Sequence, residues 1–425
     1  MSDGLTSSQA QITSSEVTLE QDEIGLSRLI RSIKLHHTRL LPLLGSHLFI
    51  DIYNSLLPII SPLLIQKYAL THLMAGFLNS LLSFTGALLQ PLYGFLCDRF
   101  HSRRFILLAP LFIALSVLGL AFAPNFGVIC LSLILLGTGF SLYHPKSTAT
   151  VGILSPEHRS TFVSLFVASG SLGSALSPFF IWLFVSSNPD TLHNLVYAIV
   201  PALAAFWCLK QVYRKKANPV HHQAQIRTQT NFGLKQLLAV CRKKDLMLLS
   251  LIVTLRSATI LTLIAFLSQL ITNDWEHHLI LAAWAATLLN VGSLVGGLFG
   301  GFLAERFNSR LLLALSLMLA APCLFGFLIY KSLTLLTLGS FLSAWSNSIS
   351  VSLSQQTVPA KAQSLASSFT MGLAWGLGSM IIPVVGWFAD VTSLTHSLSY
   401  FVPIPIFLAG LCCLWLSDCS QDKNV

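Results

Sequence analysis

The stretch "GFLCDRFHSRR" at residues 94–104 places a cluster of charged side chains between two long apolar runs. It returns as "GFLAERFNSRL" at residues 301–311, with seven of the eleven positions identical. A second pair, "SPEHRSTFVSLF" at 155–166 and "VPAKAQSLASSF" at 358–369, has an offset of 203 residues, against 207 for the first pair. The chain therefore contains two parallel repeats, and each repeat is expected to form one of two similar halves of the molecule.

The composition excludes a soluble globular domain. Hydrophobic residues make up 54% of the 425 residues and charged residues only 10%, whereas a soluble domain averages about 25% charged residues. The mean hydropathy of +0.72 agrees. The net charge of +9 comes from Lys and Arg in short loops, where they contact lipid headgroups. We therefore expect an integral membrane protein in a lipid bilayer, with no nucleic acid partner.

Twelve apolar runs approach the roughly 20 residues that a membrane-spanning helix needs. The runs must be helical because lipid offers no partner to free backbone groups, and they are too long for barrel strands. The expected spans are 41–66, 72–97, 104–123, 126–150, 161–186, 191–213, 245–271, 278–303, 311–330, 333–356, 364–389 and 396–417. The eighth contains Gly292, Gly296 and Gly300, whose spacing predicts a close contact with another helix. The fold class is thus an all-α membrane protein with six helices in each repeat.

The basic residues predict the orientation. With both termini in the cytoplasm, the outer loops hold only Lys67 and Lys331, and Lys146 and Arg256 lie within spans. The remaining 21 of the 25 Lys and Arg residues are then cytoplasmic, as the positive-inside rule requires. Residues 1–24 hold five acids and no Lys or Arg, so they are not a secretory signal. We expect a multi-pass protein of the bacterial inner (plasma) membrane.

The same pattern divides the chain into five segments. Two halves are separated by a basic loop, and polar tails flank them. The predicted segments are a mostly disordered cytoplasmic tail (1–40), an N-terminal half (41–213), a basic cytoplasmic linker (214–244), a C-terminal half (245–418) and a short cytoplasmic tail (419–425).

The charged loop resembles the motif G-x-L-x-D-R-x-G-R-[RK] between helices two and three of major facilitator superfamily transporters. The residues that match are Gly94, Leu96, Asp98, Arg99, Arg103 and Arg104, while His101 and Ser102 disturb the spacing. The resemblance covers residues 41–417 and implies twelve helices in two pseudo-symmetric halves. It also implies that the two loops form a conformational latch, made of Gly94, Asp98, Arg99, Arg103, Arg104, Gly301, Glu305, Arg306 and Arg310.

Three helical segments further resemble the fosmidomycin-resistance-type subgroup of drug and anion exporters in this superfamily. The matching positions are Ser46, His47, Asp51, Pro58, Gly137, Gly139, His144, Pro145, Gly170, Gly173 and Pro178, together with Arg256 in helix seven. The chain departs from the subgroup at Ile50 and Lys146, and its fifth helix keeps only Ser177 and Pro178 of the Gly-Pro motif. These departures bear on the substrate and on the coupling.

Ionisable side chains inside a span are costly, and they therefore point to function. His47 and Asp51 are four residues apart and share one face of helix one. Asp51 lies about ten residues, or roughly 15 Å, from the helix end, and His144 is expected at the depth of His47. Histidine changes its protonation near neutral pH, so Asp51, His47 and His144 are candidates for proton coupling. The alternatives are a structural pair within the helix packing and direct ligation of substrate.

Arg256 is expected at the same depth as Asp51, in the other half of the chain. The candidates for substrate binding are Arg256, Lys146, Asn54, Asn347 and Trp375, since a guanidinium suits phosphate or carboxylate. Two structural alternatives remain open. Arg256 can bridge to Asp51 or to backbone carbonyls across the space between the halves, and Lys146 can extend towards the membrane interface.

These observations predict a secondary active transporter working by alternating access, with proton-coupled efflux of a small anionic or amphiphilic compound, as in drug resistance. The alternatives are proton-coupled uptake or export of a metabolite or siderophore, and a membrane sensor that transports nothing. No GxxxxGK[ST] loop is present, so an ion gradient must supply the energy. No catalytic or metal-binding constellation is seen, so we expect no enzyme, no cofactor and no metal. The expected partners are a small-molecule substrate and protons, and the expected state is a monomer.

Overall fold

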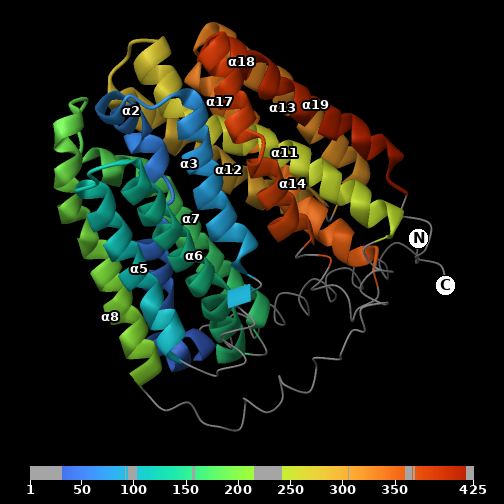
Figure 1. Ribbon diagram of the computed structural model, residues 1–425. Helices are drawn as coiled ribbons and strands as arrows, with labels where there is room; N and C mark the ends of the chain where they lie inside the picture. Colours follow the sequence, from blue (N-terminus) through green and yellow to red (C-terminus); the bar gives the residue numbers. More distant parts are fainter. Residues whose placement is uncertain are drawn as a thin grey trace, which may run out of the picture.

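The computed structural model describes residues 31–90, 92–93, 103–155, 158–214, 242–304, 306–358, 366 and 369–417. All the regular structure in these ranges is helical, which confirms the predicted fold class. Figure 1 shows the elements up to α8 grouped on one side of the molecule and those from α11 onward on the other. The predictions for the tail 1–30, Gly94, Asp98, Arg99, the linker residues 215–241, Glu305 and the last eight residues lie outside the described residues.

The first group of helices covers the six runs expected in the N-terminal half. Its first helix is already present at residue 31, where the described residues begin, ten residues before the expected span. The helix ends at residue 51, and the elements that follow are α2 (Leu56–Tyr68), α3 (His72–Ser83), η1 (Phe84–Leu88), α5 (Arg103–Ala121), α6 (Phe126–Leu154), α7 (Arg159–Trp182), η2 (Pro189–Ile199) and α8 (Val200–Arg214).

The second group covers the other six runs. Its elements are α11 (Lys244–Gln269), η4 (Leu270–Asp274), α12 (Leu279–Ala304), α13 (Ser309–Tyr330), α14 (Leu333–Gln356), η6 (Phe369–Leu373), α16 (Ala374–Ser379), α17 (Ile382–Val391), α18 (Leu394–Phe401), α19 (Pro403–Cys412) and η7 (Cys413–Trp415). Over the described ranges of both groups, nine helices are long and apolar enough to cross a membrane.

Glycines bring α12 and α14 into close contact, as their spacing predicts. A Cβ atom at Gly292 would lie 2.7 Å from the carbonyl oxygen of Thr337, and one at Gly296 would collide with the carbonyl of Phe341. At Gly300 it would collide with the backbone of Trp345. Only glycine lets the two helices approach at this distance.

The first membrane-crossing helix breaks in its middle. After Asp51 the backbone makes two tight turns, in which the Asn54 N–H donates to the Asp51 carbonyl at 3.0 Å and the Leu56 N–H to the Tyr53 carbonyl at 3.0 Å. Pro58 accounts for the break, because a proline ring clashes with the carbonyl four residues earlier. The break leaves Asp51 as the last residue of the first helical segment.

The two groups of helices meet at one end of the bundle. There, α3 of the first group begins beside the end of α17 of the second group, and Figure 1 shows the two helices together near the top of the view. Towards the opposite end, where α13 begins, the two groups diverge in the picture. We call these the Asp390 end and the Arg310 end.

Candidate functional site

Three ionisable side chains meet at the break in the first helix. Nε2 of His47 lies 3.3 Å from Oδ2 of Asp51, and Nε2 of His144, from α6, lies 3.5 Å from Oδ1. His47 is 6% exposed and Asp51 7%. The structure thus brings together the three residues that sequence reasoning assigned to proton coupling, and His144 does lie at the depth of His47.

The contact between His47 and Asp51 suits a shared proton. Nδ1 of His47 lies 2.6 Å from the carbonyl oxygen of Phe166. A carbonyl only accepts hydrogen bonds, so Nδ1 carries a hydrogen. A neutral imidazole then presents a lone pair from Nε2 to the carboxylate, and the two would repel each other. Either a protonated imidazole or a protonated carboxyl group removes this repulsion, so the geometry suits a proton shared between the two groups.

Two aromatic residues, which sequence reasoning missed, fix the His47 ring. The imidazole ring stacks on the Phe166 ring with the centroids 3.9 Å apart. The centroid of the Tyr143 ring lies 5.7 Å from that of His47. The Tyr143 hydroxyl is in turn 2.8 Å from Oγ of Ser46. The only sequence signal was an aromatic residue directly before His144, which is also common in packed helices.

Glycines on α7 make room for the triad. A Cβ atom at Gly170 would lie 2.6 Å from Oδ2 of Asp51 and would collide with the His47 ring. At Gly173 it would collide with the carbonyl of Leu48. These two glycines, which the resemblance singled out, therefore let α7 pack directly against the ionisable face of the first helix.

Two serine hydroxyl groups of α7 accept hydrogen bonds from the residues at the break in the first helix. The Asn54 side chain donates to Oγ of Ser174 at 2.7 Å, and the Ser55 N–H donates to Oγ of Ser177 at 2.8 Å. From the other half, Asn290 on α12 donates to the carbonyl of Ser174 at 3.0 Å. Asn54 therefore lies at a junction between the halves, two hydrogen bonds away from α12. Sequence reasoning included Asn54 but not Ser174 or Asn290.

Arg256, on α11, is a buried cation that forms no ion pair with the residues that the structure describes. It is 2% exposed, and its Nε and Nη1 atoms have no hydrogen-bond partner among the described residues. Its Cζ lies 5.5 Å from the centre of the Trp375 ring, which approaches from α16. A buried charge that lacks a partner costs several kcal/mol, so this site suits an anionic ligand with a flat or apolar part.

The structure does not join Arg256 to Asp51. Within the described ranges, the ion pairs of Asp51 go to His47 and His144. The bridge that we considered between Asp51 and Arg256 is therefore absent from this arrangement, because each residue faces other neighbours in its own half.

The other substrate candidates lie on helices other than that of Arg256, Lys146 on α6 and Asn347 on α14. Lys146 follows His144 by two residues on α6, which is about 200° around the helix. The two side chains therefore leave α6 on opposite sides. Asn347 is half-buried on α14.

The triad also has the side-chain types that can bind a metal ion, and one atom from each residue lies within 4.8 Å of the others. It supplies one carboxylate and two imidazoles from two helices. A shared proton also satisfies the 3.3 Å contact without any movement.

The described members of the predicted latch contact their own half. The Arg310 guanidinium donates from Nε to the carbonyl of Cys413 at 3.1 Å and also donates to the carbonyl of Leu414. Cζ of Arg306 lies 4.3 Å from the centre of the Phe302 ring. Arg310 therefore holds the end of η7, and its part in a latch stays a prediction. Gly301 lies on α12, and the side chains of Arg103 and Arg104 are outside the described part.

Comparisons with known proteins agree with this architecture. Residues 43–383 match the model of the Major Facilitator Superfamily. The chain is 26% identical over 390 residues to the fosmidomycin resistance protein of Escherichia coli (strain K12), covering 88% of this chain and 91% of the relative. It is 24% identical over 284 residues to a multi-drug resistance efflux pump PmrA homolog of Lactococcus lactis subsp. lactis (strain IL1403), covering 63% and 65%. The fold is similar to the crystal structure of a D-xylose-proton symporter, with a TM-score of 0.73 at 13% identity, covering 92% of this chain and 99% of that one.

Proposed function

The chain belongs to the Major Facilitator Superfamily, and from this premise we propose that it is a proton-coupled exporter of a small anionic or amphiphilic compound. Secondary transport follows from the family. The export direction is supported by the names of two relatives, a fosmidomycin resistance protein and a multi-drug resistance efflux pump homolog. The two halves, 41–213 and 245–418, would rock about the site between them, linked by residues 214–244.

The observation that carries the proposal is the buried triad of His47, Asp51 and His144. The His47–Asp51 contact suits a shared proton, as argued above, and the triad lies where the first helix breaks. A change in protonation at Asp51 alters the charge next to Asn54, whose hydrogen bond to Ser174 leads to the other half. Proton binding is thereby linked to the contact between the halves.

The anionic character of the cargo is supported by Arg256. A guanidinium in a low-dielectric interior is stabilised by an anion that donates no hydrogen and accepts from several N–H groups. The cargo supplies this partner, and the Trp375 ring offers a flat apolar surface beside it. Carboxylates, phosphonates and phosphates fit this chemistry, and an uncharged compound leaves the guanidinium unpaired.

The orientation in the membrane follows from the Lys and Arg distribution. The Arg310 end faces the cytoplasm together with both termini, and the Asp390 end faces outward, as the positive-inside rule directs. The protein acts as a monomer in a bacterial inner membrane. The loops at 94–104 and 301–311 then lie on the cytoplasmic side, where Asp98 and Glu305 serve as the acidic members of the latch.

Transport into proteoliposomes tests the proposal. Purified protein is reconstituted, and the movement of a phosphonate antibiotic and of an uncharged dye is followed with and without an imposed pH gradient. We expect the phosphonate to move against the direction of proton flow. Movement of the phosphonate in the same direction as protons would replace export with uptake. Absence of any gradient dependence would remove the proton from the mechanism.

A further inference from the structure

At the Asp390 end, one carboxylate joins the two halves. Asp390, at the end of α17, accepts hydrogen bonds from the backbone N–H groups of His72 at 2.7 Å and of Leu73 at 2.9 Å. These N–H groups begin α3 and have no partner within their own helix. A carboxylate is also favoured there by the helix dipole. Thr71, the N-cap residue of α3, accepts from the Met74 N–H at 3.2 Å, and the second half supplies a further cap through Asp390.

A buried chain of side chains crosses between the halves beside this contact. Nδ1 of His72 lies 2.9 Å from Oε1 of Gln269, on α11, and Nε2 of Gln269 donates to Oγ of Ser61, on α2, at 2.7 Å. Gln269 is 0% exposed and Ser61 2%. Gln269 belongs to the second half, and His72 and Ser61 belong to the first. Separation of the halves therefore breaks both the His72–Gln269 and the Gln269–Ser61 hydrogen bond.

The backbones of α3 and α17 touch beneath the Asp390 contact. A Cβ atom at Gly386 would collide with the carbonyl of His72, and one at Gly76 would lie 2.7 Å from the carbonyl of Ile382. One turn further along α3, Oγ of Ser80 donates to the carbonyl of Ser379 at 2.6 Å. The first turns of α3 therefore lie close against α17 and the end of α16, and a methyl group at Gly76 or Gly386 would force the backbones apart.

We propose that Asp390 is the releasable latch that keeps the transporter closed at this end. Asp390 is exposed, so water can replace its hydrogen bonds when the halves separate, and the cost of opening stays small. The Gln269–Ser61 chain and the glycine contact align the halves, while the carboxylate sets how often they part. This inference goes beyond the proposed function, since it concerns the conformational equilibrium and needs neither cargo nor proton gradient.

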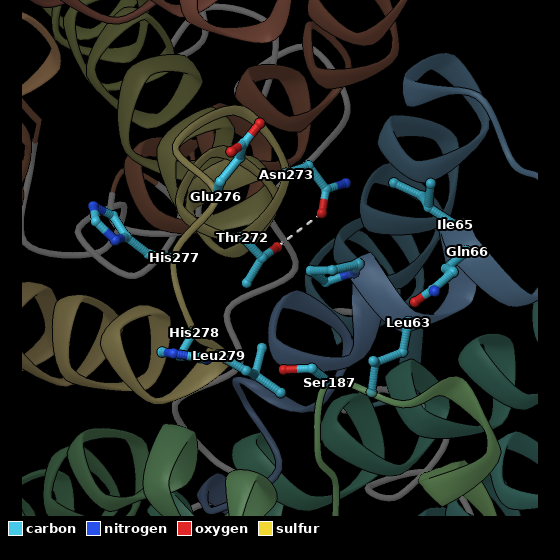
Figure 2. Close-up of a pocket in the computed structure, with 11 residues that line it drawn as sticks. Leu63, Ile65, Gln66, Ser187, Thr272, Asn273, Glu276, His277, His278 and Leu279 are labelled. Atoms are coloured by element: carbon cyan, nitrogen blue, oxygen red, sulfur yellow. Dashed lines mark hydrogen bonds between the residues drawn. The ribbon is translucent and has the colours of Figure 1, made fainter.

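The test measures the distance between the halves in lipid nanodiscs without substrate. Figure 2 shows a cavity at this end, of about 490 Å³, lined by Gln66 from the first half and by Asn273 from the second. Both residues are exposed. Unnatural amino acids with a keto group are placed at these two positions and carry nitroxide labels. The native cysteines are thereby kept. Pulsed electron paramagnetic resonance then gives the distribution of distances between the two nitroxides.

Asp390→Ala should raise the ratio of open to closed molecules about fivefold, the factor that corresponds to loss of one helix cap. Asp274→Ala is the matched control. The Asp274 carboxylate also caps a helix at this end, accepting from the N–H and Oγ1 of Thr395 at 2.9 Å each. Both of these partners lie in its own half, so the control should leave the distance distribution unchanged.

A second pair of variants keeps the proposal testable if Asp390→Ala does not fold. Gly386→Ala should also increase the open population, because its methyl group wedges the helices apart. Gly372→Ala, on η6 in the same half, places its methyl group within 4 Å of no atom in the described residues and should have no effect. An unchanged distance distribution in folded Asp390→Ala or folded Gly386→Ala protein would overturn the proposal, and so would equal opening in the two aspartate variants. Failure of transport in the proteoliposome assay would leave this result untouched.

Discussion

Nε2 of His47 lies 3.3 Å from Oδ2 of Asp51, one helical turn away on the same helix and at the residue where that helix breaks. The Nδ1–H of the same ring is committed to the Phe166 carbonyl. The orientation of the ring is therefore set by the backbone of α7, and only the Nε2 side is free to exchange a proton with Asp51. This relationship links a titratable pair to helix packing and underlies the predictions that follow.

Substitution of Gly170 by Ala should damage the site through packing. The added methyl group collides with the His47 ring, and overpacking of this kind costs about 1–3 kcal/mol. We expect a lower unfolding temperature and a loss of proton-driven transport. Gly372→Ala is the control, since its methyl group has no neighbour within 4 Å in the part of the chain that the structure describes. If the two alanine variants behave alike in thermal unfolding and transport, α7 does not position the triad.

Arg256→Lys should distinguish a ligand site from a structural cation. A lysine keeps the charge but loses the planar fork of donors. Hydrogen bonds to charged groups contribute about 1.5–3 kcal/mol, so binding of an anionic compound should weaken at least about tenfold. Binding of the uncharged dye should change little, as measured by titration of the purified protein. Equal losses for both compounds would assign Arg256 a structural role.

Asp98→Asn should slow transport without changing which compounds are carried. The loop at 94–104 is distant in sequence from the triad and from Arg256, and the motif that it matches implies a conformational role. The measurement compares initial rates for several compounds in proteoliposomes, with the rank order as the readout. An altered rank order would move this loop into the substrate path.

The helices could be predicted from the sequence because length and hydropathy alone decide whether a segment spans lipid. The meeting of His47 with Asp51 followed from their spacing of four residues, and that with His144 from depth. Depth does not give rotation about the helix axis, however. For that reason the sequence suggested that Asp51 and Arg256 could meet across the halves, whereas Asp51 faces α6 and Arg256 faces Trp375.

Contacts between distant segments could not be foreseen. Asp390 reads in sequence as an ordinary acidic residue near a loop, and its role depends on the start of α3 lying beside it. Arg310 is a second case. Its place in the repeated motif suggests a latch, and the sequence does not indicate that its guanidinium also caps the carbonyl end of the last helix. Both outcomes depend on which helices become neighbours, and this is decided by tertiary packing.

The central claim is that Asp51 carries the coupled proton, and Asp51→Asn tests it most directly. Asparagine fills the same space but cannot release a proton. In proteoliposomes that contain a pH-sensitive dye, addition of the transported compound should cause a proton flux with the unmodified protein and none with the variant. Exchange of labelled for unlabelled compound should persist in the variant, and its unfolding temperature should be retained. A substrate-driven proton flux in Asp51→Asn that equals that of the unmodified protein would contradict the account.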